Sequence, residues 1–147
     1  MKFLIRSWTF LRRLWSTPKP SREIYDAEGV GPFLFSSKDY RRSDMAPKTP
    51  AFMPSKKYNN KSVYRVSGLD ANELKRIGWI YVGIFRGKRP KAFAEVEAKK
   101  CRLESLRIVP DISPHPRHAN IDGWPSLKAA QMSLAQQIAT HARVLEL

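Results

Sequence analysis

Apolar and polar residues alternate, or apolar residues run together, in four short segments of the chain. Residues 62–69 (SVYRVSGL) and 92–98 (AFAEVEA) alternate with a period of two, while 33–37 (FLFSS) and 106–110 (LRIVP) are short apolar runs. A period of two is typical of a strand that buries one face, and a short apolar run suits a buried strand. We therefore predict four strands, of which the one at 62–69 is half-buried.

A helical period replaces this alternation between residues 71 and 86. Apolar side chains recur there at spacings of three and four residues, at Leu74, Ile77, Tyr81 and Ile84. Asp70 and Glu73 have the spacing of a capping box, and Gly87 suits the end of a helix. The pattern predicts a helix over 71–86, although WIYVGIF taken alone would also suit a strand.

A second helical pattern fills residues 126–147, where apolar side chains form one stripe. Proline is favoured in the first turn of a helix, so we expect Pro125 there. The strands and helices together predict an α+β fold in a single small domain. Its sheet is expected to be short and mostly antiparallel, with two main helices.

The N-terminal residues differ in pattern from the strands and helices of the compact domain. We expect residues 1–32 to form a basic amphipathic arm with a linker rich in Pro and Gly, and 33–147 to form the compact domain. The arm is an amphipathic helical pattern over residues 1–16, which Pro18 and Pro20 bring to an end. Three interpretations stay open: binding to an anionic membrane surface, organellar targeting, and docking on the body of the protein or on a partner protein.

The net charge of the chain indicates which class of partner it is suited to bind. The 147 residues include 27 Lys and Arg against 13 Asp and Glu, which gives a net charge of +14. A surplus of this size in a single small domain favours an anionic partner such as nucleic acid, an anionic membrane or an acidic protein. The single cysteine, Cys101, excludes an internal disulfide and a multi-cysteine zinc site, and it favours a reducing, cytoplasmic compartment.

Two segments combine basic side chains with aromatic residues or a turn. Residues 38–61 are basic, rich in proline and interleaved with aromatic residues, and 86–91 (RGKRPK) is a basic turn. Basic side chains neutralise phosphates and aromatic faces stack on bases, so both segments are candidate contacts for RNA or single-stranded DNA. The residues predicted to bind nucleic acid are Arg41, Arg42, Lys56, Lys57, Arg86, Lys88, Arg89 and Lys91.

The segment 114–125 (PHPRHANIDGWP) carries the candidate chemistry. His115, His118 and Arg117 are the residue types that metal-independent RNA cleavage requires: a general base, a general acid and a cation. In extended backbone the two imidazoles would lie on opposite sides, and only a turn at Pro116 would bring them together. The other interpretation is structural, because prolines, turn residues and a tryptophan suit a rigid entry to the last helix.

The same segment carries a resemblance to other proteins. FLFSS, AFMPS, SVYRVSGL and above all PRHANIDGWP before the last helix resemble a group of uncharacterised small bacterial proteins. The resemblance covers residues 33–147 and implies a compact cytosolic bacterial domain. No activity is attached to the group, so no functional residue carries over.

These patterns lead to three hypotheses of function. The first is a small basic, non-enzymatic protein that binds RNA or single-stranded DNA through its basic loops. The second is a ribonuclease-like, phosphoester-cleaving enzyme or toxin that uses His115 and His118. The third is a membrane-surface or partner-docking protein that uses residues 1–16, and none of the three requires a metal or a cofactor.

Overall fold

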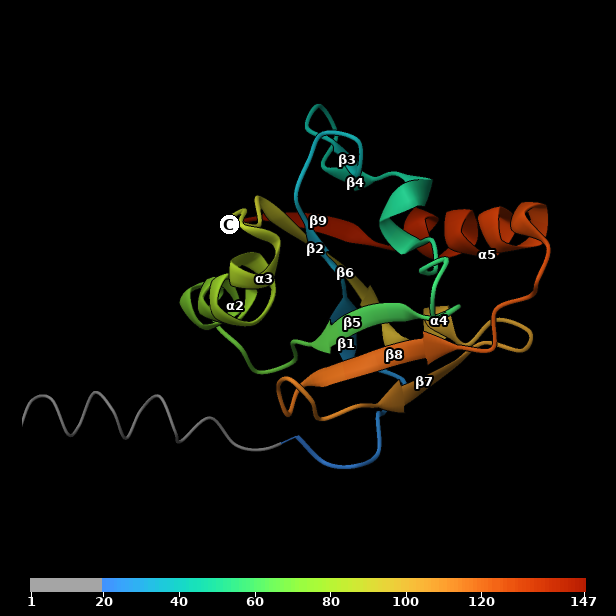
Figure 1. The fold of residues 1–147 in the computed structure, drawn as a ribbon, viewed down its shortest axis with the longest axis horizontal. Coiled ribbons are helices and arrows are strands. Elements are labelled where there is room, and N and C mark those ends of the chain that lie inside the picture. Colours follow the sequence, from blue (N-terminus) through green and yellow to red (C-terminus); the bar gives the residue numbers. More distant parts are fainter. Residues whose placement is uncertain (1–19) are drawn as a thin grey trace, which may run out of the picture.

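A computed structural model describes residues 20–147 and confirms the α+β class: one small domain built on a mostly antiparallel sheet (Figure 1). The predicted arm at residues 1–16 lies outside the described residues. Within the described part of the chain, no helix combines the length and the apolar character needed to cross a membrane.

The sheet has the strand order β2-β6-β1-β5-β8-β7, and β9 pairs with the other edge of β6. Every one of these pairs is antiparallel. The strands are β1 (Gly29–Gly31), β2 (Phe33–Leu34), β5 (Lys61–Arg65), β6 (Ala92–Glu97), β7 (Arg107–Pro110), β8 (His118–Asp122) and β9 (Arg143–Glu146), and a separate hairpin joins β3 (Tyr40–Arg41) to β4 (Ala46–Pro47).

Strands β1 and β2 both pair with β6. Their pairing keeps one continuous register, which is interrupted only at Pro32. Val30 pairs with Val96 and Phe33 pairs with Phe93, so the two short strands act as a single strand beside β6. A side chain at Gly31 would bring its Cβ to 1.6 Å from the carbonyl oxygen of Ala94. Glycine therefore allows the close approach of the two strands at this point.

One helical segment spans residues 71–86 as predicted, in three consecutive parts: α2 (Ala71–Ile77), a π-helical stretch η2 (Gly78–Gly83) and α3 (Ile84–Arg86). The capping box is confirmed: the Glu73 amide donates to the Asp70 carboxylate at 2.8 Å, and the Asp70 amide donates to Glu73 at 3.3 Å. Gly87 ends the segment in a left-handed conformation with a φ of 64°.

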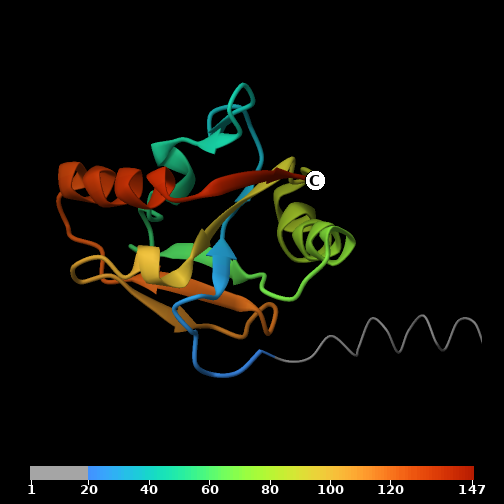
Figure 2. The same cartoon turned by 180° about the vertical axis from the view of Figure 1, so that it is seen from behind.

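The remaining helices are the 3₁₀ helix η1 (Thr49–Phe52), the short α4 (Ala98–Cys101) and α5 (Lys128–Thr140). Buried side chains of all three share the larger hydrophobic core with alternate residues of the sheet, among them Val30, Val63, Val96 and Ile121. A smaller cluster on the other face contains Phe33, Tyr64 and Phe93 with Leu74 and Ile77 of α2. Alpha-helices α5 and α2 lie on opposite sides of the molecule in both views (Figures 1 and 2).

Because both faces of the sheet are covered here, β5 is not half-buried. Val63, Tyr64 and Arg65 are all buried. Arg65 points toward the segment before β1 and pairs with the Glu28 carboxylate through two hydrogen bonds, of 2.5 and 2.8 Å. It also donates to the carbonyls of Ser21 and Glu23, which attaches residues 21–28 to the sheet.

Several boundaries differ from the sequence prediction. The helix predicted over 126–147 begins only at Lys128, three residues after Pro125, and ends at Thr140. Residues 143–146 instead form β9, because β6 offers them a free edge. The sheet already begins at β1, so the folded body extends to the N-terminal side of residue 33.

Candidate functional site

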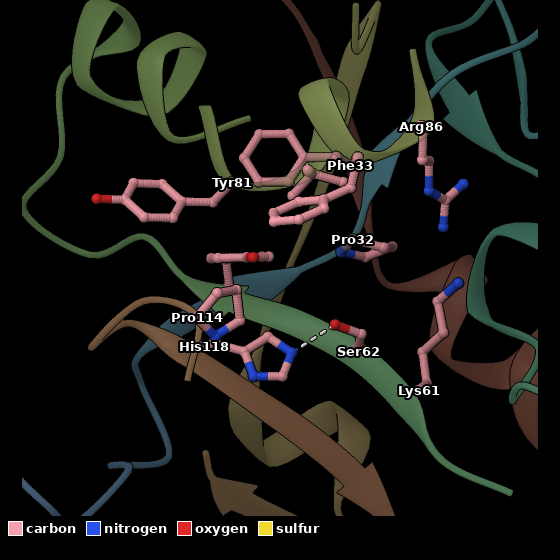
Figure 3. A pocket seen from close by; sticks show the side chains of 11 residues that line it. Pro32, Phe33, Lys61, Ser62, Tyr81, Arg86, Pro114 and His118 are labelled. Carbon is pink, nitrogen blue, oxygen red and sulfur yellow. Dashed lines mark hydrogen bonds between the residues drawn. The ribbon is translucent and has the colours of Figure 1, made fainter. Parts of the chain in front are cut away.

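The second face of the sheet is left open beside the helical segment 71–86, and a pocket of about 260 Å³ lies there. Figure 3 shows Ser62 and His118 on the sheet, with Tyr81 and Arg86 of the helical segment on the opposite side of the pocket. The lining residues are Pro32, Phe33, Lys61, Ser62, Tyr64, Tyr81, Val82, Phe85, Arg86, Pro114 and His118.

Ser62 and His118 meet on this face because of the register between β5 and β8. Tyr64 pairs with His118 and Ser62 pairs with Asn120, so these four side chains lie on one face of the sheet. His118 is diagonally opposite Ser62, and its Nε2 atom lies 2.5 Å from the Ser62 Oγ atom (Figure 3).

The surroundings of His118 fix the direction of this hydrogen bond. Its Nδ1 atom lies 2.9 Å from the backbone carbonyl oxygen of Asp111. A carbonyl can only accept, so Nδ1 carries the proton and Nε2 of the neutral ring is an acceptor. The Ser62 hydroxyl therefore donates its proton toward Nε2, as in a serine that is activated by a general base.

Asp111 also brings its carboxylate to the same imidazole. One carboxylate oxygen lies 3.5 Å from His118 Nδ1 and accepts a 3.1 Å hydrogen bond from the Asn120 side chain. The three groups follow the serine–histidine–carboxylate order, although the carbonyl of Asp111 is closer to the ring than its carboxylate. Only 7% of His118 is exposed, whereas Ser62 is exposed at the pocket.

Two cations lie on one side of the pocket. Figure 3 shows Lys61 and Arg86 extending toward each other there. Burial, and then the charge of Arg86, lower the pKa of Lys61 to about 8, against a smaller opposing effect of Asp39. No carboxylate pairs with either cation among residues 20–147, and the Arg86 guanidinium instead stacks 4.7 Å from the Phe35 ring centre. The pair therefore forms a partly desolvated positive site.

Aromatic rings form much of the pocket wall. Phe33, Tyr64, Tyr81 and Phe85 line it. Phe85 is 81% exposed and lies directly before Arg86, so an aromatic face and a cation are offered together. Burial raises the pKa of Tyr64 to about 12, which keeps this phenol neutral.

The other two candidate residues of the segment 114–125 lie differently. A turn at Pro116 brings His115 and His118 to the same Tyr64 ring, with ring centres 6.4 and 5.3 Å away. Burial, followed by the charges of Arg117 and His118, lowers the pKa of His115. The Arg117 guanidinium is buried and donates to the carbonyls of Arg65 and Ser67, so it does not line the pocket.

The predicted nucleic-acid contacts lie in different surroundings. Arg41 and Arg42 are exposed but form ion pairs with Asp44 and Glu146. Lys56 and Lys57 lie in an exposed turn, where the Lys57 amino group is 5.1 Å from the Tyr58 ring centre. Of the predicted set, Arg86 alone lines the pocket described above.

The basic turn 86–91 contributes to a second hollow as well. Arg89 stacks 4.9 Å from the Trp79 ring centre, and both line a pocket of about 420 Å³ with Lys75 and Arg76. Lys88 and Lys91 are exposed and line neither of the two pockets. The structure thus places basic residues on both sides of the helical segment 71–86.

Sequence reasoning missed Ser62 and Asp111 as residues of this site, and it included Lys61 only as part of the basic segment 38–61. Ser62 and His118 are far apart in the chain, and only the pairing of β5 with β8 joins them. The run HANI before the turn residues carried the signal for a strand, since its alternating side chains suit β8. That pairing would have placed His118 near Ser62.

No cluster of three or more metal-ligating His, Cys, Asp or Glu side chains occurs in residues 20–147. Cys101 is buried, and this burial raises the pKa of its thiol to about 12, so the thiol is not poised as a nucleophile. Comparison with protein-family models, curated proteins and solved structures finds no match to this chain.

Proposed function

We propose that this protein binds RNA or single-stranded DNA, and that the pocket between β5, β8 and the helical segment 71–86 is the centre of the binding surface. The observation that carries the proposal is the combination of two cations, Lys61 and Arg86, which pair with no carboxylate among residues 20–147, with the exposed ring of Phe85. A nucleotide offers the complementary pair, an anionic phosphate and a flat base.

The electrostatics of the pocket support an anionic ligand. Lys61 and Arg86 repel each other, and this repulsion contributes to the lowered pKa of Lys61. A phosphate placed between them would offset the repulsion and raise the pKa of the lysine again. Binding of an anion would thus offset the repulsion between the two cations.

The aromatic side chains favour an unstacked base over a duplex. Phe85 and Tyr81 come from the helical segment, whereas Tyr64 lies in the sheet, so rings face the pocket from two sides. A hollow of about 260 Å³ suits a base and a phosphate, but not the side of a continuous double helix. Single-stranded segments expose base faces for such stacking.

Fluorescence anisotropy with a labelled single-stranded RNA of roughly 12 nucleotides tests this proposal, because such a length covers one binding site. We expect Phe85→Ala to weaken binding by about tenfold through lost stacking, and Arg86→Gln to weaken it by a similar factor. Matched controls are Tyr25→Ala and Arg41→Gln, an exposed tyrosine and a paired surface arginine outside the pocket.

Equal losses in the pocket variants and in the controls would contradict the assignment of the pocket. A wild-type protein that does not bind the RNA even at low salt would overturn the proposed function itself. A labelled duplex of the same sequence provides the second comparison, and we expect it to bind more weakly than the single strand.

A further inference from the structure

We propose that Ser62 is a nucleophile that cleaves a phosphodiester bond of the bound strand, with His118 as its general base and acid and Asp111 as the residue that orients the imidazole. The proposal rests on the proposed function for its substrate class, since single-stranded nucleic acid supplies the phosphodiester. The geometry of Ser62, His118 and Asp111 carries the catalytic part independently.

Three features distinguish this group from an ordinary surface hydrogen bond. The Ser62 hydroxyl donates to a buried imidazole whose other nitrogen is held by the Asp111 carbonyl, so the tautomer required of a base is fixed. Ser62 itself is an exposed residue and lines the pocket, where a substrate can reach it. Lys61 and Arg86 line the same pocket. Cations placed in this way stabilise the negative charge that develops on the phosphoryl oxygens during the reaction.

In the first step, the Ser62 Oγ atom attacks the phosphorus and its proton passes to His118 Nε2. The bond between phosphorus and one sugar oxygen breaks, and the leaving oxygen takes the proton from Nε2. The strand is now cut, and one fragment is joined to Ser62 as a phosphodiester.

In the second step, a water molecule gives one proton to His118 Nε2 and its oxygen attacks the phosphorus. The bond between phosphorus and Oγ breaks, and Oγ regains the proton from Nε2. The sum of both steps is hydrolysis of one phosphodiester bond by one water, with serine and histidine returned to their initial state. No metal ion or redox partner enters this balance.

Covalent labelling of the full-length protein tests the nucleophile without any need for nucleic acid. A fluorophosphonate forms an Oγ–P bond with an activated serine while its P–F bond breaks and fluoride leaves. We expect peptide mass mapping to find the label on Ser62. Ser105→Ala serves as the matched control and should be labelled like wild type, because the Ser105 hydroxyl donates to the Gly123 carbonyl and has no base beside it.

Ser62→Ala should abolish the labelling and reduce cleavage of the labelled RNA by about a thousandfold or more, while its affinity for the RNA stays within about twofold of wild type. His118→Gln should abolish the labelling as well. Since His118 is buried, Asp111→Asn is a second variant that keeps the carbonyl partner of Nδ1, and we expect it to slow labelling by about tenfold.

The outcomes separate the two proposals. Binding of RNA without labelling of Ser62 would overturn the nucleophile and leave the binding function in place. Labelling of Ser62 without RNA binding would overturn the binding function and the phosphodiester substrate together. Labelling of Ser62 and RNA binding without cleavage would overturn the assignment of the phosphodiester as substrate.

Discussion

Lys61 is the residue at which the proposed function and the stability of the fold oppose each other. It is partly buried, faces the cation of Arg86, and has a pKa of about 8 in place of the usual 10.5 of a lysine. The native state therefore disfavours the charged lysine, whereas the unfolded chain does not. If the proposed anion site is correct, Lys61 supports it at a cost in folding stability.

The stability of the protein should consequently depend on pH in a defined direction. Below about pH 8 both states are protonated, and the native state carries the full cost of the buried charge. As the pH rises from about 8 toward 10.5, the native state releases its proton before the unfolded chain does, so stability increases. Above this window both states are neutral and the cost disappears.

We expect Lys61→Met to raise the free energy of unfolding at about pH 7 by roughly 1–3 kcal/mol, since it removes this cost, and to weaken RNA binding. Urea denaturation at about pH 7 and about pH 9.5 measures the effect, which should be smaller at the higher pH. Lys56→Met, at an exposed position of the preceding turn, is the control. A destabilised Lys61→Met variant at neutral pH would contradict the interpretation.

At the scale of elements, the sequence predicted a helix or strand correctly where all the residues that specify it lie within the element. The helix over 71–86 was predicted because its capping box, its apolar spacing and its final glycine all lie within the segment, and the structure confirms each of them. The glycines inside it are packed: a Cβ at Gly78 would approach the Phe33 ring to 2.6 Å. The helical segment is thereby held close to the sheet beside the pocket.

Elements that depend on a distant partner were missed. Strand β1 lies within a segment rich in Pro and Gly that favours a linker, yet β5 and β6 pair with it on both sides. The residues of β9 continue the apolar spacing of the preceding helix, but they pair with β6 and form an edge strand. In both cases backbone hydrogen bonds to another part of the chain outweighed the local preference.

A substitution at Gly31 tests whether the pairing of β1 with β6 stabilises the fold. Gly31→Ala would place a Cβ 1.6 Å from the Ala94 carbonyl oxygen, so β1 and β6 must separate. We expect a loss of at least about 3 kcal/mol in the free energy of unfolding, measured by urea denaturation.

The matched control is Gly68→Ala, where φ is 81° but nothing lies within 4 Å of the added Cβ. Gly68→Ala should lower the free energy of unfolding by only about 1 kcal/mol, because only the left-handed backbone conformation is unfavourable for alanine there. Equal losses in both variants would show that the close approach of β1 to β6 does not limit stability.

At the scale of the whole molecule, the net charge of +14 indicated an anionic partner but not where it binds. Ion pairing then distinguishes the cations: Arg41 and Arg42 are neutralised locally, whereas Lys61 and Arg86 are not paired with a carboxylate within residues 20–147. We therefore expect the surplus charge to attract an anionic partner mainly at cations that pair with no carboxylate in the described residues.

This difference should be visible in the salt dependence of RNA binding. Each phosphate that a cation neutralises on a single strand contributes about 0.7 to the slope of log Kd against log salt. We expect Arg86→Gln to reduce the slope by about this amount and Arg41→Gln to leave it unchanged. Anisotropy titrations between about 50 and 200 mM salt measure the slopes, and an equal reduction in both variants would contradict the distinction.

The sequence by itself determined the α+β class, the helix at 71–86 with both of its ends, the strands near 62–69, 92–98 and 106–110, and the basic character of the surface. Each of these follows from local spacing or from composition. It also directed attention to His118, as one of three candidate residues in a segment with two interpretations.

Only the tertiary structure decided which groups His118 contacts. The pairing of β5 with β8 places it against Ser62, the end of β7 brings Asp111 to its other nitrogen, and the helical segment closes the pocket with Arg86. These residues come from four elements that are separate in the chain. Their chemistry depends on distances of a few ångströms, and strand register, which no local pattern specifies, sets those distances.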